Sequence, residues 1–191
     1  MALFFLIKTG RSLVLPKQTE EQLFKMAQEV SEREGCHLYD IEFVGRGKER
    51  TLRVYIDTLD HRVTIDQCAN VSRGLSLLLD VEDLIPGDSY HLEVSSPGLE
   101  RPLKRWWHFQ EVQGEMVSVK TLSPIPVPEG LKSKFKNPRQ QIKGTLASVD
   151  EAKKTLKIVC DGETWDVPFQ IIRAAKKLYQ FDEASNKKKK R

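Results

Sequence analysis

The sequence has few of the residues that build disulfide frameworks, zinc sites and membrane spans. The chain has three cysteines, Cys36, Cys68 and Cys160, which are far apart and lack C-x-x-C spacing. This odd number and this spacing argue against a disulfide framework and a zinc site, and they fit a reducing compartment. No apolar run approaches the roughly 20 residues of a membrane helix. The apolar start, residues 2–7, lacks the basic region and cleavage site of a signal peptide. We therefore expect a cytoplasmic protein without membrane contact.

Motifs of catalysis are also missing. The four histidines show no HExxH or other paired ligand spacing. Gly45 and Gly47 are followed by neither a third glycine nor Gly-Lys-Ser/Thr, which excludes a phosphate-binding loop. Ser95 and Ser96 lack the Gly-x-Ser-x-Gly frame of a nucleophile elbow. The sequence therefore predicts a binding protein, not an enzyme, with no cofactor and no metal ion.

Charge is divided unevenly along the chain. Residues 16–100 hold 9 Lys and Arg against 17 Asp and Glu, a net charge of −8, whereas residues 101–191 hold 20 against 10, a net charge of +10. Residues 1–15 add two basic groups. Because phosphate attracts a basic domain and repels an acidic one, we expect one partner that carries both signs of charge, or two partners.

The acidic half has the periodicity of a mixed α+β domain. Thr19 with Gln22, and Thr64 with Gln67, have the spacing of capping boxes and are expected to begin two helices. Alternation of apolar and polar residues indicates strands between and after these helices. We expect, in order, a helix from 19 to 35, strands at 37–44 and 51–56, a helix from 64 to about 83, and a strand at 90–94. Such an α-β-β-α-β order predicts a sheet covered by two helices.

The basic half consists mainly of short alternating runs. They predict strands at 116–120, 142–149, 155–159, 164–168 and 174–179, with a helical turn at 169–173. Five short strands with tight turns suggest a small all-β barrel. The aromatic and basic run 105–109 fits either base stacking or packing at the start of a domain, and packing is favoured.

A joint between the two halves is expected at 92–103. Pro97 and Gly98 supply the fixed and the permissive φ of a tight turn, and Pro102 biases Arg101 toward an extended conformation. The expected organisation is an N-terminal extension at 1–16, an α/β domain at 17–98, a linker at 99–104, a barrel at 105–181 and a basic tail at 182–191.

Three groups of residues are candidates for function. The first forms the joint: Ser95, Ser96, Pro97, Gly98, Glu100, Arg101 and Pro102. The second offers cations to phosphate from the first hairpin turn, a proline-rich loop and the last strand: Arg46, Lys48, Arg50, Lys132, Lys134, Lys136, Arg139, Lys143, Lys176 and Lys177. The third would contact a basic protein: Asp80, Glu82 and Asp83. Ordinary solvated surface charge is the competing interpretation for the hairpin turn and for the acidic residues.

The joint also carries a family resemblance. Residues 77–83, leading through 90–103, resemble the signature of the bacterial ribosome maturation factor RimP, and the order of elements is similar from about Lys17 to Phe181. The resemblance implies an Sm-like (SH3-type) barrel and a monomer without catalytic activity that assists assembly of the small (30S) ribosomal subunit. It implies binding of the immature particle through a small-subunit ribosomal protein of the decoding region, and rRNA is a further candidate partner. Residues 1–15, the loop 124–139 and the basic tail look longer than the usual pattern.

Two alternatives to this function stay open. The first is a general RNA-binding regulator built on an Sm-like barrel, for which an oligomeric ring would be the discriminating observation. The second is a hydrolase that acts on RNA. Because residues distant in the sequence can converge in space, the absence of catalytic motifs makes the hydrolase the weakest of the three hypotheses.

Overall fold

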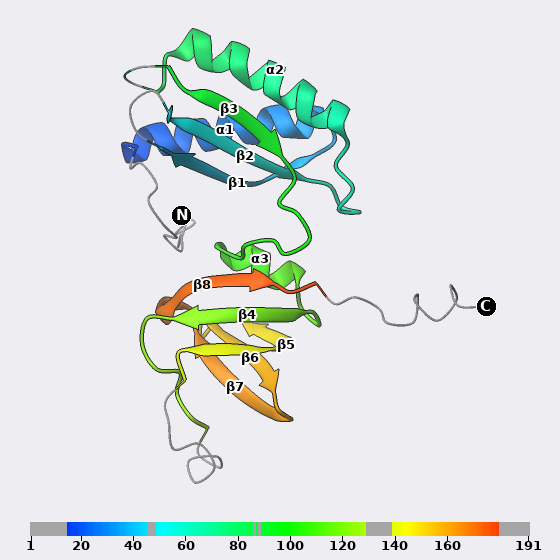
Figure 1. The fold of residues 1–191 in the computed structure, drawn as a ribbon, viewed down its shortest axis with the longest axis vertical. Helices are drawn as coiled ribbons and strands as arrows, with labels where there is room; N and C mark the ends of the chain where they lie inside the picture. Colours follow the sequence, from blue (N-terminus) through cyan, green and yellow to red (C-terminus); the bar gives the residue numbers. More distant parts are fainter. Residues whose placement is uncertain (1–14, 46–48, 86, 88, 129–138, 180–191) are drawn as a thin grey trace, which may run out of the picture. The chain divides into compact units, whose positions relative to one another are not determined.

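The structure is a computed structural model that describes residues 15–45, 49–85, 87, 89–128 and 139–179. These residues divide into two compact units, one ending at Gly98 and the other beginning at Leu99 (Figure 1). The protein is thus a mixed α+β chain with two separate sheets and two separate cores. Each unit is described by itself below.

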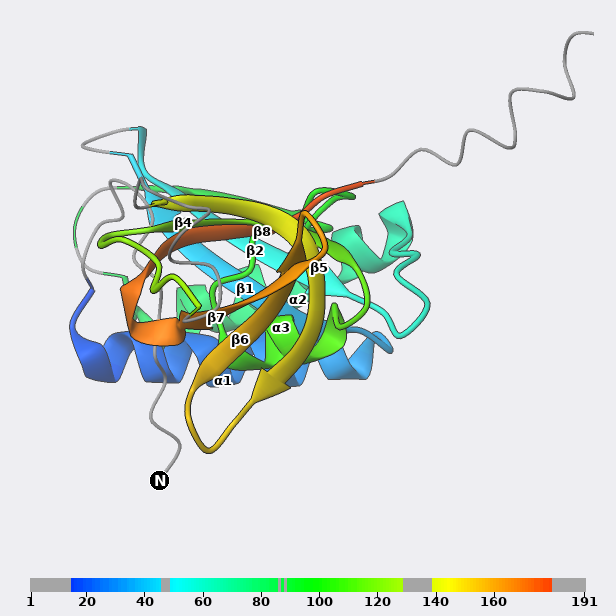
Figure 2. The ribbon, with the colours of Figure 1, turned by 90° about the horizontal axis from the view of Figure 1, so that it is seen from below.

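The first unit is a three-stranded sheet with two helices on one face (Figures 1 and 2). Its elements are α1 (Lys17–Arg33), β1 (His37–Val44), β2 (Thr51–Asp57), α2 (Ile65–Glu82) and β3 (His91–Ser95). The strand order is β1-β2-β3, with β1 antiparallel and β3 parallel to β2. Leu52, Val54 and Ile56 of the central strand are fully buried, because every second residue faces the helices. The predicted α-β-β-α-β order is confirmed.

One predicted helix start is confirmed and the other is wrong. Thr64 caps α2 with a complete capping box, in which its side chain and that of Gln67 each accept from the other's backbone N–H. The first helix instead begins two residues before Thr19, with Pro16 at the N-cap position and no side-chain cap. The fixed φ of Pro16, −52°, directs the chain into the helix without a capping side chain, so Thr19 lies inside the first turn. Gly35 follows the helix at φ +71°, as a helix terminator should.

The second unit is a five-stranded antiparallel sheet preceded by a short helix. Its elements are α3 (Trp106–Glu111), β4 (Met116–Thr121), β5 (Gln141–Asp150), β6 (Thr155–Cys160), β7 (Glu163–Pro168), the 3-10 helix η3 (Phe169–Ile171) and β8 (Ile172–Lys177). The strand order is β7-β6-β5-β4-β8. Within the described residues β7 and β8 are the two edges of the sheet, which curls without closing (Figure 2). In place of the expected small barrel, the described residues form a curled sheet that does not close, and η3 carries the chain from one edge strand to the other.

The aromatic run before the sheet packs into the core of the second unit. Phe109 is fully buried, and its ring meets that of Phe169 edge to face at 5.8 Å. Trp106 meets the same phenylalanine at 5.3 Å, again edge to face. Trp165 of β7 is also fully buried. These contacts support the packing interpretation of the run over base stacking, since rings fixed in a core offer no face to a base.

Candidate functional site

The first four joint residues lie at the end of β3. Ser95 is the last residue of that strand and pairs in register with Tyr55 of β2. Ser96 is exposed and Pro97 is half-buried. Gly98 has a φ of +78°, where a side chain would be strained although no heavy atom lies within 4 Å of a Cβ placed there. The first unit thus ends in a turn that requires glycine because of its positive φ and not because of lack of space for a side chain.

The remaining joint residues run along β8. Pro102 forms an isolated antiparallel bridge with Lys176, and the carbonyl of Arg101 accepts a hydrogen bond from the backbone of β8. Leu103 is fully buried and Arg101 is 7% exposed. The carboxylate of Glu100 forms an ion pair with the Lys176 ammonium. This segment is therefore held by hydrogen bonds and burial within the second unit.

The predicted acidic residues at the end of α2 are all exposed, but they lie beside different parts of the first unit. Asp83 caps the helix in the left-handed conformation, with a φ of 45°. Burial, and then the negative charge of Asp80, raise the pKa of the Tyr90 hydroxyl, and Asp83 adds to this shift. Glu82 instead lines a hollow of about 280 Å³ beside α1. The other lining residues are Gln22, Lys25, Met26, Glu29, Arg33, Leu78 and Leu84.

Two of the predicted phosphate contacts have partners within their own units. Arg50 is half-buried, and its guanidinium lies over the Phe43 ring at 5.7 Å. Arg139 lies over the Trp165 ring at 5.1 Å and forms an ion pair with Asp161 at 3.5 Å. A phosphate group would have to compete with these contacts. The hairpin and loop cations Arg46, Lys48, Lys132, Lys134 and Lys136 lie outside the described residues.

The strand register brings two other predicted cations together and separates a third from them. Ser118 of β4 is directly opposite Lys143 of β5 on one side and Lys176 of β8 on the other. Directly opposed residues share a face of the sheet, so Lys143 and Lys176 lie on one face. Lys177 follows Lys176 in the strand and therefore faces the other side, where it pairs with Glu115 at 3.2 Å.

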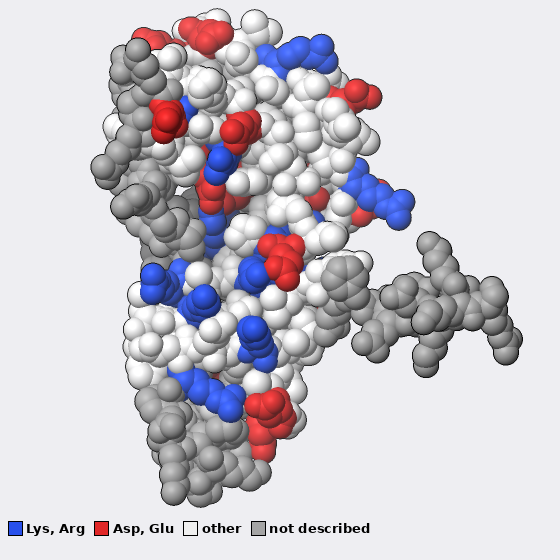
Figure 3. Space-filling model, viewed as in Figure 1, with Lys and Arg blue, Asp and Glu red and all other residues white. Residues whose placement is uncertain are grey.

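Periodicity alone did not mark two further cations as functional. Lys120 is exposed on β4, two residues from Ser118 and thus on the same face. Arg173 is exposed at the β-bulge of β8, where the register with β4 shifts. Figure 3 shows Lys and Arg side chains gathered over the strands of this unit, with few acidic ones among them. The signal in the sequence was the alternation of Val117, Ser118, Val119 and Lys120, which places Lys120 on the polar side of the strand.

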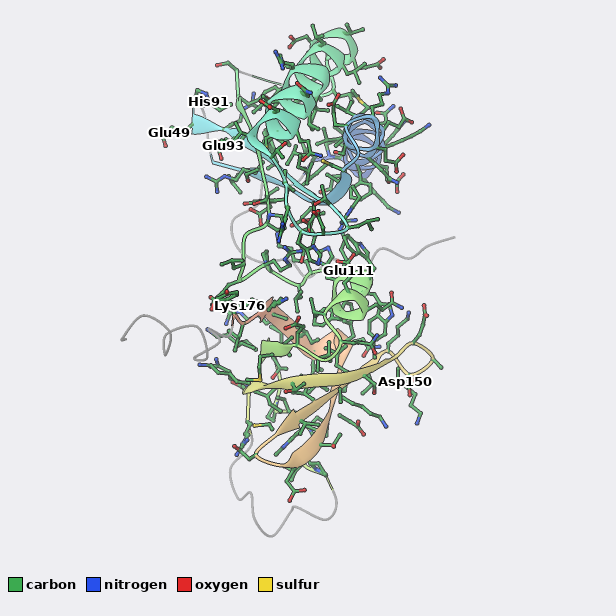
Figure 4. All side chains as sticks on the ribbon, turned by 90° about the vertical axis from the view of Figure 1, so that its right-hand side faces the viewer. Glu49, His91, Glu93, Glu111, Asp150 and Lys176 are labelled. Carbon is green, nitrogen blue, oxygen red and sulfur yellow. The ribbon has the colours of Figure 1, made fainter. Side chains whose placement is uncertain are left out.

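The first unit has a polar sheet face that was likewise not predicted. Glu42, Arg53 and Glu93 lie opposite one another on β1, β2 and β3. The Arg53 Nε donates to Glu93 at 2.7 Å, and this hydrogen bond, with the charge of Glu93, raises the pKa of Arg53. His91 and Glu93 lie together at this side of the unit (Figure 4). The helices cover the opposite face, so this side of the sheet carries charge, with Arg53 held between two carboxylates.

A family comparison accounts for the first unit. Residues 26–100 match the family model described as RimP N-terminal domain. The match covers less than half of the chain and supports the RimP family. RimP proteins form a ribosome maturation factor family, and the resemblance drawn from residues 77–83 and 90–103 is thereby confirmed. The match ends at Glu100, inside the joint signature.

The described part of the chain holds little reactive chemistry. Burial raises the pKa of all three thiols, those of Cys36, Cys68 and Cys160, which lowers their thiolate content at neutral pH. The described residues contain no group of three or more His, Cys, Asp or Glu side chains that could hold a metal ion. In the same residues no helix is long and apolar enough to cross a membrane.

Proposed function

We propose that this protein is a non-catalytic factor for assembly of the small (30S) ribosomal subunit and binds the immature particle in the cytoplasm. The observation that carries the proposal is the RimP N-terminal domain at residues 26–100, which continues into the joint signature. The charge division supports it, because an acidic and a basic unit together suit a particle made of basic proteins and RNA.

The second unit is proposed to be an Sm-like domain. The support is its topology: a short helix precedes five antiparallel strands, and the first strand, β4, lies between the second and the last. In this proposal the unit contributes to holding a small-subunit ribosomal protein of the decoding region, and the protein acts as a monomer. The expected domain limits, 17–98 and 105–181, belong to the same proposal.

Sedimentation of cell extract tests the function directly. The protein should migrate with immature small subunits and be absent from translating ribosomes. Absence from both fractions would refute the proposal. Equal occupancy of mature and immature particles would refute the maturation role, because a maturation factor must leave the finished subunit.

The acidic end of α2 tests the contact with a basic protein. Charge reversal at Glu82 and Asp83, both exposed, should weaken capture of small-subunit ribosomal proteins by the purified protein. The matched control reverses two exposed acids of the other unit, Glu151 and Asp166. If the two double variants capture these proteins equally well, the end of α2 is ordinary surface.

A general RNA-binding regulator is the second candidate, because its proposed Sm-like domain would be the same five-stranded sheet. Light scattering separates the two functions. A ring-sized oligomer would favour the regulator, whereas a monomer would favour the assembly factor.

A further inference from the structure

The outer face of β8, β4 and β5 carries cations in adjacent cross-strand rows. The register places Lys176, Ser118 and Lys143 in one row and Ala174, Lys120 and Gln141 in the next. Val117 and Val119, which alternate with these positions on β4, are fully buried on the other face. The outer face therefore presents lysines among small and uncharged polar residues, and no acidic residue occupies either row.

Most of these cations are available to a ligand. Lys120 and Lys143 are exposed, and neither forms an ion pair with any residue that the structure describes. The same is true of Arg173 at the bulge. Lys176 pairs with Glu100. Figure 4 places the labelled acids Glu111 and Asp150 on the opposite side of this unit from Lys176.

The spacing of the cations suits a chain of phosphates. Neighbouring strands lie about 4.8 Å apart, so the Cα atoms of Lys143 and Lys176, two strands apart, are separated by about 10 Å. Lys120 lies about 7 Å along its strand from the row of Ser118. Long side chains spread over such an area can contact several phosphates of one nucleic-acid backbone at once.

The chemistry of this face distinguishes between kinds of RNA. Single strands are held mainly by stacking of their bases on aromatic side chains, whereas base-paired RNA is recognised by its shape and through phosphate and 2′-hydroxyl groups. Neither row contains an aromatic residue. Gln141 is exposed and adds a hydrogen-bonding group suited to hydroxyl and phosphate oxygens, whereas Ser118, 6% exposed, lies below the level of the lysine side chains and is not offered to a ligand. The exposed aromatic nearest in sequence, Tyr179, lies two residues beyond the end of β8.

We propose that the outer face of β8, β4 and β5 binds the phosphate backbone of base-paired RNA. This inference deepens the proposed function, on which it rests for the identity of the RNA: the double-stranded segments of rRNA in the immature particle. Lys120 and Lys143 supply the main contacts, with Arg173 and Lys176 beside them. Lys177, Arg50 and Arg139, which have other partners, are not part of this surface.

Binding of a labelled RNA duplex of about 16 base pairs to the full chain tests the inference by fluorescence anisotropy across a salt series. The double variant Lys120→Gln and Lys143→Gln should bind about tenfold more weakly, and the slope of log K against log salt should fall by about two. Replacing both lysines by arginine should preserve binding. The matched control, Lys17→Gln with Lys153→Gln, removes the same charge from exposed positions outside the two cross-strand rows and should bind like the unaltered protein.

Several results would overturn the inference. One is equal duplex affinity for the double variant and the control. The inference would be overturned in this case also if the double variant no longer captured an acidic protein, because the face would then bind protein and not RNA. Another is that an unpaired RNA strand of the same length binds as tightly as the duplex and that Tyr179→Ala weakens the binding of this strand. An unchanged denaturation midpoint would show that the double variant is folded. Failure to migrate with immature subunits, with duplex binding intact, would refute the proposed function alone, and the reverse pattern would refute this inference alone.

Discussion

Gly144 is the position at which the close packing of β5 against β6 can be tested most directly. It lies on β5 between Lys143 and Thr145, at a point where β6 approaches very closely. A Cβ added at Gly144 would lie 2.2 Å from the carbonyl oxygen of Val159 and 3.0 Å from the Ile158 side chain. Because the nearer atom belongs to the backbone, it cannot rotate away. The two strands would have to separate by about 1 Å to restore an ordinary contact.

The cost of Gly144→Ala follows from that separation. Moving β5 from β6 by about 1 Å stretches the two or so ladder hydrogen bonds beside this point, each worth about 1 kcal/mol, and loosens the packing around them. Overpacking a well-filled interior typically costs 1–3 kcal/mol. We expect a loss of about 3 kcal/mol in the free energy of unfolding, a large part of the roughly 5–15 kcal/mol that stabilises a domain.

Urea denaturation followed by tryptophan fluorescence measures this loss in the right part of the chain. All three tryptophans, at 106, 107 and 165, lie in the second unit. With a slope of about 2 kcal/mol per molar urea, the midpoint should fall by about 1.5 M. Gly162→Ala is the control, because Gly162 has a φ of +78° but no atom within 4 Å of the added Cβ, which limits its cost to about 1 kcal/mol. Equal midpoints for the two variants would refute the steric argument.

Three further predictions concern the first unit. Thr64→Ala should cost about 1 kcal/mol by removing the cap of α2, and Thr64→Ser should retain most of it; equal unfolding midpoints would contradict the role of the cap. His61→Ala should cost about 1–3 kcal/mol, because the Asp57 carboxylate, 1% exposed, loses a partner at 2.8 Å, and Asp57→Asn in the same background should recover part of the loss. The pKa of Tyr90 is raised in the folded state, so its contribution to stability is fully present below pH 10.0, the ordinary pKa of tyrosine, and is lost as the pH rises through the folded-state pKa. Tyr90→Phe should therefore flatten the decline in melting temperature at alkaline pH. An unchanged decline would count against this prediction.

Local patterns in the sequence predicted local structure well. The strand at 37–44 was placed with its observed limits, because a half-buried strand repeats its polarity every two residues. The cap at Thr64 was recognised because both partners of the capping box lie within four residues. The same motif at Thr19 was misleading, since Pro16 begins the helix two residues earlier and the local pattern could not rank the two signals.

The parts that were missed depend on pairing between distant strands. The face formed by Lys120, Lys143 and Lys176 comes from three strands, and only their register shows that Ser118 lies between two of these lysines. Lys176 and Lys177 appeared equivalent in the sequence, yet consecutive strand residues point to opposite sides. Closure of the sheet could not be predicted either, because it depends on whether the edge strands β7 and β8 meet.

The ion pair between Glu100 and Lys176 affects how counterion release should be interpreted. The carboxylate of Glu100 offsets part of the positive charge that Lys176 would otherwise offer to a phosphate. An RNA phosphate that approaches Lys176 must compete with Glu100, so this lysine neutralises less phosphate charge and releases fewer of the cations condensed on the RNA. The slope for the unaltered protein therefore undercounts the lysines in contact with RNA, and Glu100→Gln should steepen it by about one. Glu100 of the joint thus neutralises one lysine of the outer face of β8, β4 and β5.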